Sequence, residues 1–420
     1  MILYLKNAIY IDWQTFEFKK CTIKVEEGID KNFEFINENE ISEKSQVIDC
    51  EGKYVTKSFA CGHHHIYSAL ACGMPPPAKN PENFFEILKY IWWNIDKKLD
   101  KQMIEASALT TAIELAKQGS TFVIDHHASP FFIKNSLDII AKAFDKVGVS
   151  HLLCYEITDR DGLDKAEEGV LENERHIKEN QGLVGIHASF TVNDATLRKA
   201  ADVVEKYNSG VHIHVAEDIA DQEFCEKDYN KRVVERLEGY GFLNYSKSII
   251  AHAIHINENE RKILKNSKAW LVQNAESNQN NKVGNFSSLG LSEKIMLGTD
   301  GMHSNMLRST KAALYSASKN EDTGFDTIYN RFRNVHNYLK QNDFKGDGNN
   351  NLVVLDYNPR TDFNQNNFLG HFVFGIESNH IQHVISNGKL IVKDRIVQTI
   401  DEQEVHKFSR EQSLRLWEKL

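Results

Sequence analysis

Five separated fragments of the sequence end in side chains that can bind a metal ion or move a proton. They occur at residues 62–65, 212–217, 251–252, 274–278 and 298–301. Most of them follow a short apolar run, which is typical of a β-strand. Three imidazoles, one carboxylate ligand and one further glutamate would together form a hydrolytic site of the zinc type.

The metal ligands predicted from these fragments are His63, His65, His214 and Asp300. A single His-x-His pair means little, because a chain with 18 histidines contains roughly one such pair by chance. However, residues i and i+2 of a strand face the same side, so His63 and His65 can point together. Three nitrogens and one oxygen leave a position for water, as in a catalytic site. We therefore expect one divalent metal ion, Zn²⁺ or, as the alternative, Fe²⁺.

The predicted catalytic residues are Glu217, His252 and Asp300. Glu217 lies three residues beyond His214, past the predicted strand end, where it suits a general acid/base near the metal but not bound to it. Such a metal lowers the pKa of its water to about 7. Asp300 would take the water proton, and Glu217 would protonate the leaving nitrogen. His252 would polarise the substrate or the water; the alternatives are a fourth metal ligand or a residue that only supports the ligands.

Six further residues are candidates for substrate contact: His187, Arg160, Trp92, His127, Asn278 and His303. Trp92 lies in the long segment after the first predicted strand, and the other five lie at or just beyond predicted strand ends. Trp92 and Trp93 could stack on a planar ring as part of a lid, or else pack in the core or against another subunit. Arg160 could bind a carboxylate or carbonyl, or else form a surface ion pair. His187 could contact the substrate or make only a structural hydrogen bond.

An alternation of strands and helices that begins near residue 52 would position these side chains. Apolar runs predict eight strands, at residues 54–62, 121–126, 151–158, 183–187, 211–217, 248–252, 269–274 and 294–300. Helical spacing lies between most of them, at residues 103–117, 132–146, 164–179, 194–207, 228–238 and 258–264. This pattern predicts an α/β fold, a (β/α)8 TIM barrel over residues 53–349, with its site at the carboxyl ends of the strands.

The two ends of the chain have a different pattern. Short predicted strands before residue 52 and after residue 350 indicate a small composite β-sandwich of residues 1–52 and 350–420. Asn387 and Gly388 lie between alternating apolar residues and are typical of a hairpin turn. A final helix is expected at residues 402–419.

With these motifs in place, the chain resembles the amidohydrolase superfamily, in its mononuclear aminohydrolase and chlorohydrolase branch. The resemblance covers nearly the whole chain and rests on residues 63–65, 185–188, 214–217, 251–252, 277–278 and 298–301. The likeness to SsnA-type aminohydrolases is greatest and rests on residues 63–70, 125–130, 154–156, 159–162 and 276–278. The resemblance implies metal binding by His63, His65, His214 and Asp300, and proton transfer by Glu217 with His252. By analogy it also implies a homodimer.

Bulk properties argue against several other classes of protein. The net charge of −9, without Lys/Arg clusters, argues against nucleic acid or an anionic membrane as a partner. No uncharged apolar stretch approaches the roughly 18–20 residues of a transmembrane helix. The six cysteines form no CxxC pair, which favours reduced thiols and a cytoplasmic location.

We therefore expect a metal-dependent hydrolase that acts on a C–N bond of a small heterocyclic substrate. Deamination of a purine- or pyrimidine-like ring is the leading reaction, and ring opening of a cyclic amide is the alternative. Ammonia release separates the two. A third hypothesis is a catalytically inactive barrel that serves as a binding module. The complete set of ligands and proton-transfer residues argues against it.

Overall fold

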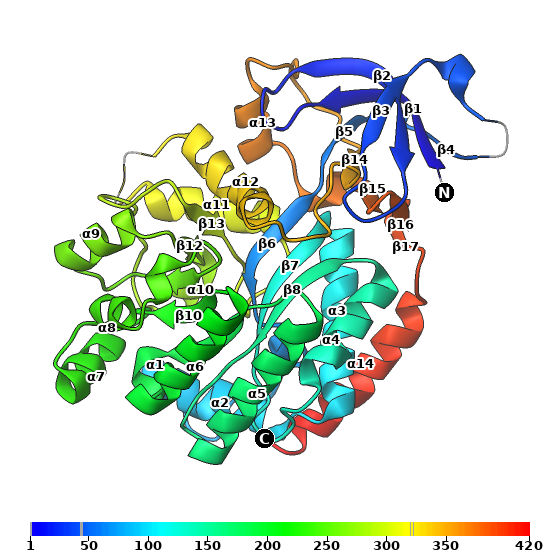
Figure 1. Cartoon of the computed structure of the whole chain (residues 1–420). Helices are drawn as coiled ribbons and strands as arrows, with labels where there is room; N and C mark the ends of the chain where they lie inside the picture. Colours follow the sequence, from blue (N-terminus) through cyan, green and yellow to red (C-terminus); the bar gives the residue numbers. More distant parts are fainter. Residues whose placement is uncertain (1, 43–44, 320, 322) are drawn as a thin grey trace.

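The computed structural model describes residues 2–42, 45–319, 321 and 323–420. Its centre is a barrel of parallel strands (Figure 1). Two parallel sheets, of three and five strands, make up the barrel wall. Isolated bridges from His64 to Asp300 and from Ile157 to Ile186 join the sheets at both seams. The strands are β6 (Phe59–His64), β7 (Ser120–His127), β8 (Ser150–Tyr155), β9 (Val184–Ala188), β10 (Val211–Val215), β11 (Ile249–His252), β12 (Trp270–Gln273) and β13 (Ile295–Leu297). The predicted TIM barrel is confirmed.

Helices follow most barrel strands and cover the outside of the wall (Figure 1). They are α3 (Lys101–Lys117), α4 (Ser136–Val147), α5 (Leu163–Glu179), α6 (Asp194–Tyr207), α7 (Ile219–Tyr229), α8 (Val233–Gly239), α9 (Glu258–Asn266), α10 (Ala275–Asn280), α11 (Met306–Ala317) and α12 (Phe325–Gln341). The single helix predicted at residues 228–238 is wrong. Asn230 has a φ of 53°, in the left-handed region, and ends α7, so that a separate helix, α8, starts at Val233.

Strands from both ends of the chain form one nine-stranded sheet. They are β1 (Ile2–Ile11), β2 (Phe18–Glu26), β3 (Phe33–Ile36), β4 (Gln46–Asp49), β5 (Tyr54–Lys57), β14 (Leu352–Leu355), β15 (Ile381–Ser386), β16 (Lys389–Lys393) and β17 (Ile396–Val397). The sheet branches at β1, which pairs with β4 along its first half and with β5 near its end. Its core includes Leu5, Ile23, Val55, Leu352 and Ile385, from both ends of the chain. The β-rich terminal region is confirmed.

The strand predicted at residues 54–62 is two strands in two different sheets. β5 pairs with β1 and β14 in the terminal sheet, whereas β6 pairs with β7 in the barrel. The break lies at Ser58, where Arg333 of α12 donates hydrogen bonds to the carbonyls of Lys57 and Ser58. An apolar run shows that a segment is buried, but it does not show that the segment changes sheet.

Two further segments matter for the site. Between β6 and α3 the chain forms η2 (Ile66–Ala71), α1 (Phe84–Ile87), a π-helical turn (Leu88–Trp92), α2 (Trp93–Ile95) and η4 (Asp96–Lys98). The final helix, α14 (Glu402–Trp417), lies beside α3 (Figure 1). Within the described residues, we find no helix with the length and apolar character that crossing a bilayer requires.

Candidate active site

A cavity opens where the barrel strands end. Its polar wall comes from strand ends and includes His65, Glu156, His187, His214, Glu217 and Asp300. Its apolar wall comes from the segment between β6 and α3 and includes Phe84, Leu88, Trp92 and Trp93. An apolar wall with a few convergent polar groups is typical of a site for a small molecule.

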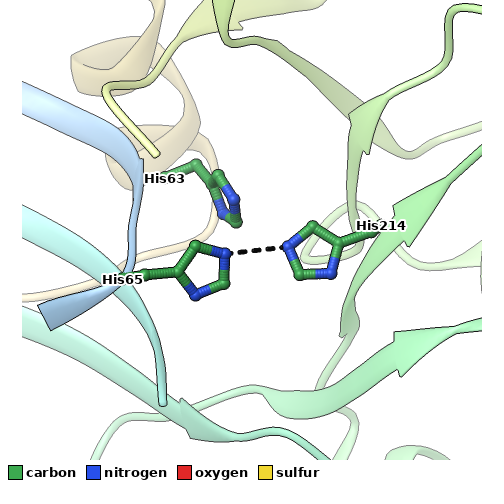
Figure 2. A group of neighbouring side chains, drawn as sticks. All are labelled: His63, His65 and His214. Atoms are coloured by element: carbon green, nitrogen blue, oxygen red, sulfur yellow. Dashed lines mark hydrogen bonds between the residues drawn. The ribbon is translucent and has the colours of Figure 1, made fainter. Parts of the chain in front are cut away.

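Three imidazoles from the ends of β6 and β10 converge at this cavity (Figure 2). Ring nitrogens of His63, His65 and His214 lie within 4.8 Å of one another. His65 Nδ1 donates to the carbonyl of His126 at 2.7 Å, and His214 Nδ1 donates to the carbonyl of His187 at 2.8 Å. Because a carbonyl can only accept, Nδ1 holds a proton in each of these rings, and in the neutral ring Nε2 is then the atom with the lone pair. These two atoms face each other at 3.0 Å.

His63 is oriented by another imidazole. Its Nδ1 lies 2.8 Å from Nε2 of His212, while its own Nε2 is buried and has no hydrogen-bond partner among the described residues. Sequence reasoning missed His212 as a site residue. The signal was present, because His212 and His214 are two residues apart on β10 and therefore face the same side.

Asp300 brings a carboxylate to the same point from beyond β13. Its Oδ1 lies 3.3 Å from His65 Nε2 and 3.8 Å from His63 Nε2. Its backbone N–H donates to the His63 carbonyl at 3.1 Å, and its φ is 56°. A left-handed conformation costs a non-glycine residue about 1–2 kcal/mol. The contact that closes the barrel therefore also holds this strained residue against the histidines.

This donor set fits a divalent cation. Burial, together with neighbouring histidines, holds the pKa values of His63 and His214 well below the usual range, so both rings are neutral donors. A cation between the facing Nε2 atoms would remove their repulsion and give His63 Nε2 a partner. Three nitrogens and a carboxylate oxygen are also typical ligands of catalytic zinc-type sites. The residues that could hold the ion are His63, His65, His214 and Asp300.

Glu217 and His252 lie next to Asp300. His252 Nε2 is 3.4 Å from Glu217 Oε2 and 3.7 Å from Asp300 Oδ2. Burial, together with the nearby Asp300, raises the pKa of Glu217 well above the usual carboxyl range. Burial would also raise the pKa of Asp300, but His65 and His252 hold it below its usual value. These opposite shifts favour the protonated form of Glu217 and the ionised form of Asp300 beside it, an arrangement that separates an acid from a base.

Residues at α10 orient this pair. The Asn278 side-chain amide contacts His252 Nδ1 at 2.8 Å, and Asn281 Nδ2 donates to Glu217 Oε1 at 3.4 Å. In the part of the chain that the structure describes, His252 Nε2 is buried and has no hydrogen-bond partner, and burial lowers the pKa of His252 to about 4. His252 also has a positive φ, 71°, which turns the chain sharply at the end of β11. The neutral ring therefore presents Nε2 towards both carboxyl groups.

The other residues predicted to contact substrate fall into two groups. His187 and Trp92 line the cavity, and Asn278 reaches the site through His252. His127 and His303 are not part of the cavity lining: His127 Nε2 contacts Ser129 Oγ at 2.9 Å, and His303 Nε2 pairs with Glu276.

Arg160 also lies outside the cavity lining, but its ion pairs are buried rather than at the surface. Its side chain is 8% exposed and pairs with Asp96 of η4, and its Nε lies 3.1 Å from Asp161 Oδ2. Its guanidinium also lies over the ring of Trp93, 5.1 Å from the centroid. Arg160 therefore links the segment that covers the cavity to the loop after β8.

Sequence reasoning gave no role to Glu156, which lines the cavity directly after β8. The rule that strand ends carry site residues should have identified it. It also missed Phe84 and Leu88 of the cavity wall, because apolar residues in a loop region carry no signal that separates a cavity wall from ordinary packing.

Comparisons with known proteins identify the family and the fold of the chain. The amidohydrolase family matches residues 54–328. The chain is 24% identical to a 5'-deoxyadenosine deaminase of Methanococcus maripaludis, over 95% of this chain and 97% of that protein. It is 28% identical to a 5-methylthioadenosine/S-adenosylhomocysteine deaminase of Aquifex aeolicus, over 93% and 94%. The fold is similar to that of a zinc-bound adenosine deaminase from Xanthomonas campestris, with a TM-score of 0.81, 15% identity and coverage of 99% and 98%.

Proposed function

Because the chain belongs to the amidohydrolase family, we propose that it is a metal-dependent hydrolase that removes an amino group from a small nitrogen heterocycle. One observation carries the proposal. Glu217 and His252 lie against Asp300, beside three converging imidazoles and at the edge of a cavity. That arrangement provides a site for a metal, a base and a proton donor within a few ångströms.

The residues would divide the reaction between them. A divalent ion held by His63, His65, His214 and Asp300 would supply a water activated for attack on an sp² carbon. Asp300 accepts the proton of that water at Oδ2, which faces His252 Nε2. Glu217 gives its carboxyl proton to the departing nitrogen. A C–O bond forms, the C–N bond breaks, and ammonia leaves. The proton on Asp300 then returns to Glu217 by way of His252, whose Nε2 lies 3.7 Å from Asp300 Oδ2 and 3.4 Å from Glu217 Oε2.

We further propose zinc as the metal and a purine- or pyrimidine-like ring as the substrate. Nitrogen-rich ligation supports zinc. The names of the similar deaminases, which act on adenosine derivatives, support the ring class. Trp92 and Trp93 in the cavity wall offer flat apolar faces against which such a ring can stack.

The test is ammonia release from zinc-loaded protein with a panel of aminopurines and aminopyrimidines. We expect release that falls by about 10²–10⁴-fold in Glu217→Ala, because the proton donor is lost. Glu114→Gln, an exposed carboxylate on α3, is the matched control and should keep its activity. Loss of ring absorbance without ammonia would point to ring opening instead. Protein that binds no metal would contradict both reactions.

A further inference from the structure

Glu156 is a carboxylate in the cavity to which the proposed mechanism gives no task. Its backbone N–H donates to the His127 carbonyl at 2.7 Å, which fixes its place directly after β8. The residue is only 3% exposed, yet it lines the cavity. One of its oxygens lies within 4.8 Å of nitrogens of His187 and His214. It therefore stands beside the proposed reaction site.

The carboxylate of Glu156 is surrounded by basic groups, but they do not satisfy it. His126 Nδ1 lies 3.4 Å from Oε2 and has no hydrogen-bond partner within the described structure. Arg160 Nη2 lies 3.9 Å from Oε1, because the same guanidinium pairs with Asp96 and Asp161. A buried carboxylate normally accepts several hydrogen bonds. Both oxygens of Glu156 therefore have capacity left for a group that enters the cavity.

His187 adds a second acceptor to the same wall. Thr191 Oγ1 donates to the Ala188 carbonyl at 3.0 Å, so His187 Nδ1, at 2.9 Å from that hydroxyl, must be the donor of its own contact. The other ring nitrogen, Nε2, is then an acceptor. A wall with a carboxylate and an imidazole lone pair requires donors from the ligand.

We infer that Glu156, with His187 beside it, determines specificity by accepting hydrogen bonds from N–H groups on the substrate ring. The inference rests on the proposed function, since it concerns the same heterocycle. It assigns the substrate class more narrowly: besides the amino group that leaves, the ring carries a ring N–H beside a second exocyclic amino group, a pair of donors that matches the two oxygens of a carboxylate. Arg160 is then a positioning residue, which holds Glu156 and ties it to Asp96 in the covering segment.

The experiment measures equilibrium binding of two rings to zinc-loaded Glu217→Ala protein by calorimetry. Isocytosine carries a ring N–H beside an amino group, whereas pyrimidine carries no N–H. Adding Glu156→Gln should weaken isocytosine binding about 10–100-fold, the loss expected for a charged hydrogen bond, and leave pyrimidine nearly unchanged. Glu156→Asp keeps the charge on a shorter side chain and should recover part of the loss. Glu114→Gln in the same background is the control.

Three results would overturn the inference: an unchanged ratio of the two affinities, failure of isocytosine to bind, or a second equivalent of zinc that Glu156→Gln removes. The zinc content of each variant also shows whether its site has formed. Other results would contradict the proposed function but not the role of Glu156. Ring binding that depends on Glu156, without ammonia from any ring in protein with Glu217 intact, would contradict the deaminase alone. Ammonia release with an unchanged affinity ratio would contradict only the role of Glu156.

Discussion

At the scale of single residues, each ligand imidazole is held by a hydrogen bond through its second nitrogen. His65 and His214 use backbone carbonyls, but His63 depends on one side chain, His212. We predict that His212→Asn weakens zinc binding by about 10–100-fold, because the ring of His63 loses its fixed orientation. Competition with a chelating indicator would measure this. His151→Asn, on β8 and outside the site, is the control, and equal affinities in both variants would show that His63 needs no support.

His176 on α5 gives a pH dependence that is independent of the metal site. Burial lowers its pKa to about 4, and both ring nitrogens lack hydrogen-bond partners within the described structure. An unfolded histidine has a pKa of about 6.5, so the unfolded state binds the extra proton between these values. Stability is therefore lost as the pH falls through this window, by about 2 kcal/mol at pH 5. Denaturant unfolding should be measured at pH 7.5 and at pH 5. Between these two values, the free energy of unfolding should fall by about 2 kcal/mol more in wild type than in His176→Gln. Equal losses in the two proteins would contradict the assignment.

The candidate ligands and proton donor could be predicted from the sequence because their signals are local. Each lies at the end of an apolar run, and His63 and His65 share the spacing of a strand. The environment of Arg160 could not be predicted in this way. Its partner Asp96 is 64 residues earlier in the chain, and nothing in the local pattern distinguishes a buried ion pair from an exposed one.

At the scale of elements, the same limits apply to strand and helix boundaries. The order of the eight barrel strands followed from their alternation with helices. The division of residues 54–62 did not, because it depends on Arg333, which binds the chain at Ser58 from 275 residues away. The break between α7 and α8 depends on Asn230, a single residue in a left-handed conformation within a run of good helix formers.

Gly298, just after β13, lies where the last barrel strand meets the first. A Cβ at this position would lie 2.8 Å from both Cβ and the carbonyl oxygen of His63. We predict that Gly298→Ala lowers the free energy of unfolding by about 1–3 kcal/mol, as overpacking does. It should also weaken zinc binding, because His63 must move. Gly370→Ala, in α13 (Phe368–Phe374), meets nothing within 4 Å and is the matched control. Normal zinc affinity in Gly298→Ala would show that the contact between the last and first barrel strands can adjust without moving His63.

At the scale of the whole molecule, segments that are far apart in the sequence contact the region around His63 and His65. Asp300 closes the barrel against His63, and the C-terminal helix α14 reaches η2, where Trp417 Nε1 donates to the Leu70 carbonyl at 2.9 Å. The four proposed ligands come from the first, fifth and eighth barrel strands. An ion bound to them would therefore cross-link three strands of the barrel instead of binding to a single loop.

This cross-link predicts that metal binding and global stability are coupled. A ligand that binds only the folded state stabilises it by RT ln(1 + [L]/Kd), or about 4 kcal/mol at a thousand times Kd. Removal of the metal with a chelator should therefore lower the melting temperature of the whole protein, and returned zinc should restore it in proportion to the logarithm of its concentration. His214→Asn removes one imidazole from the set, so its melting temperature should respond much less to zinc. A wild-type melting temperature that is insensitive to the metal would mean that the barrel closes fully without it.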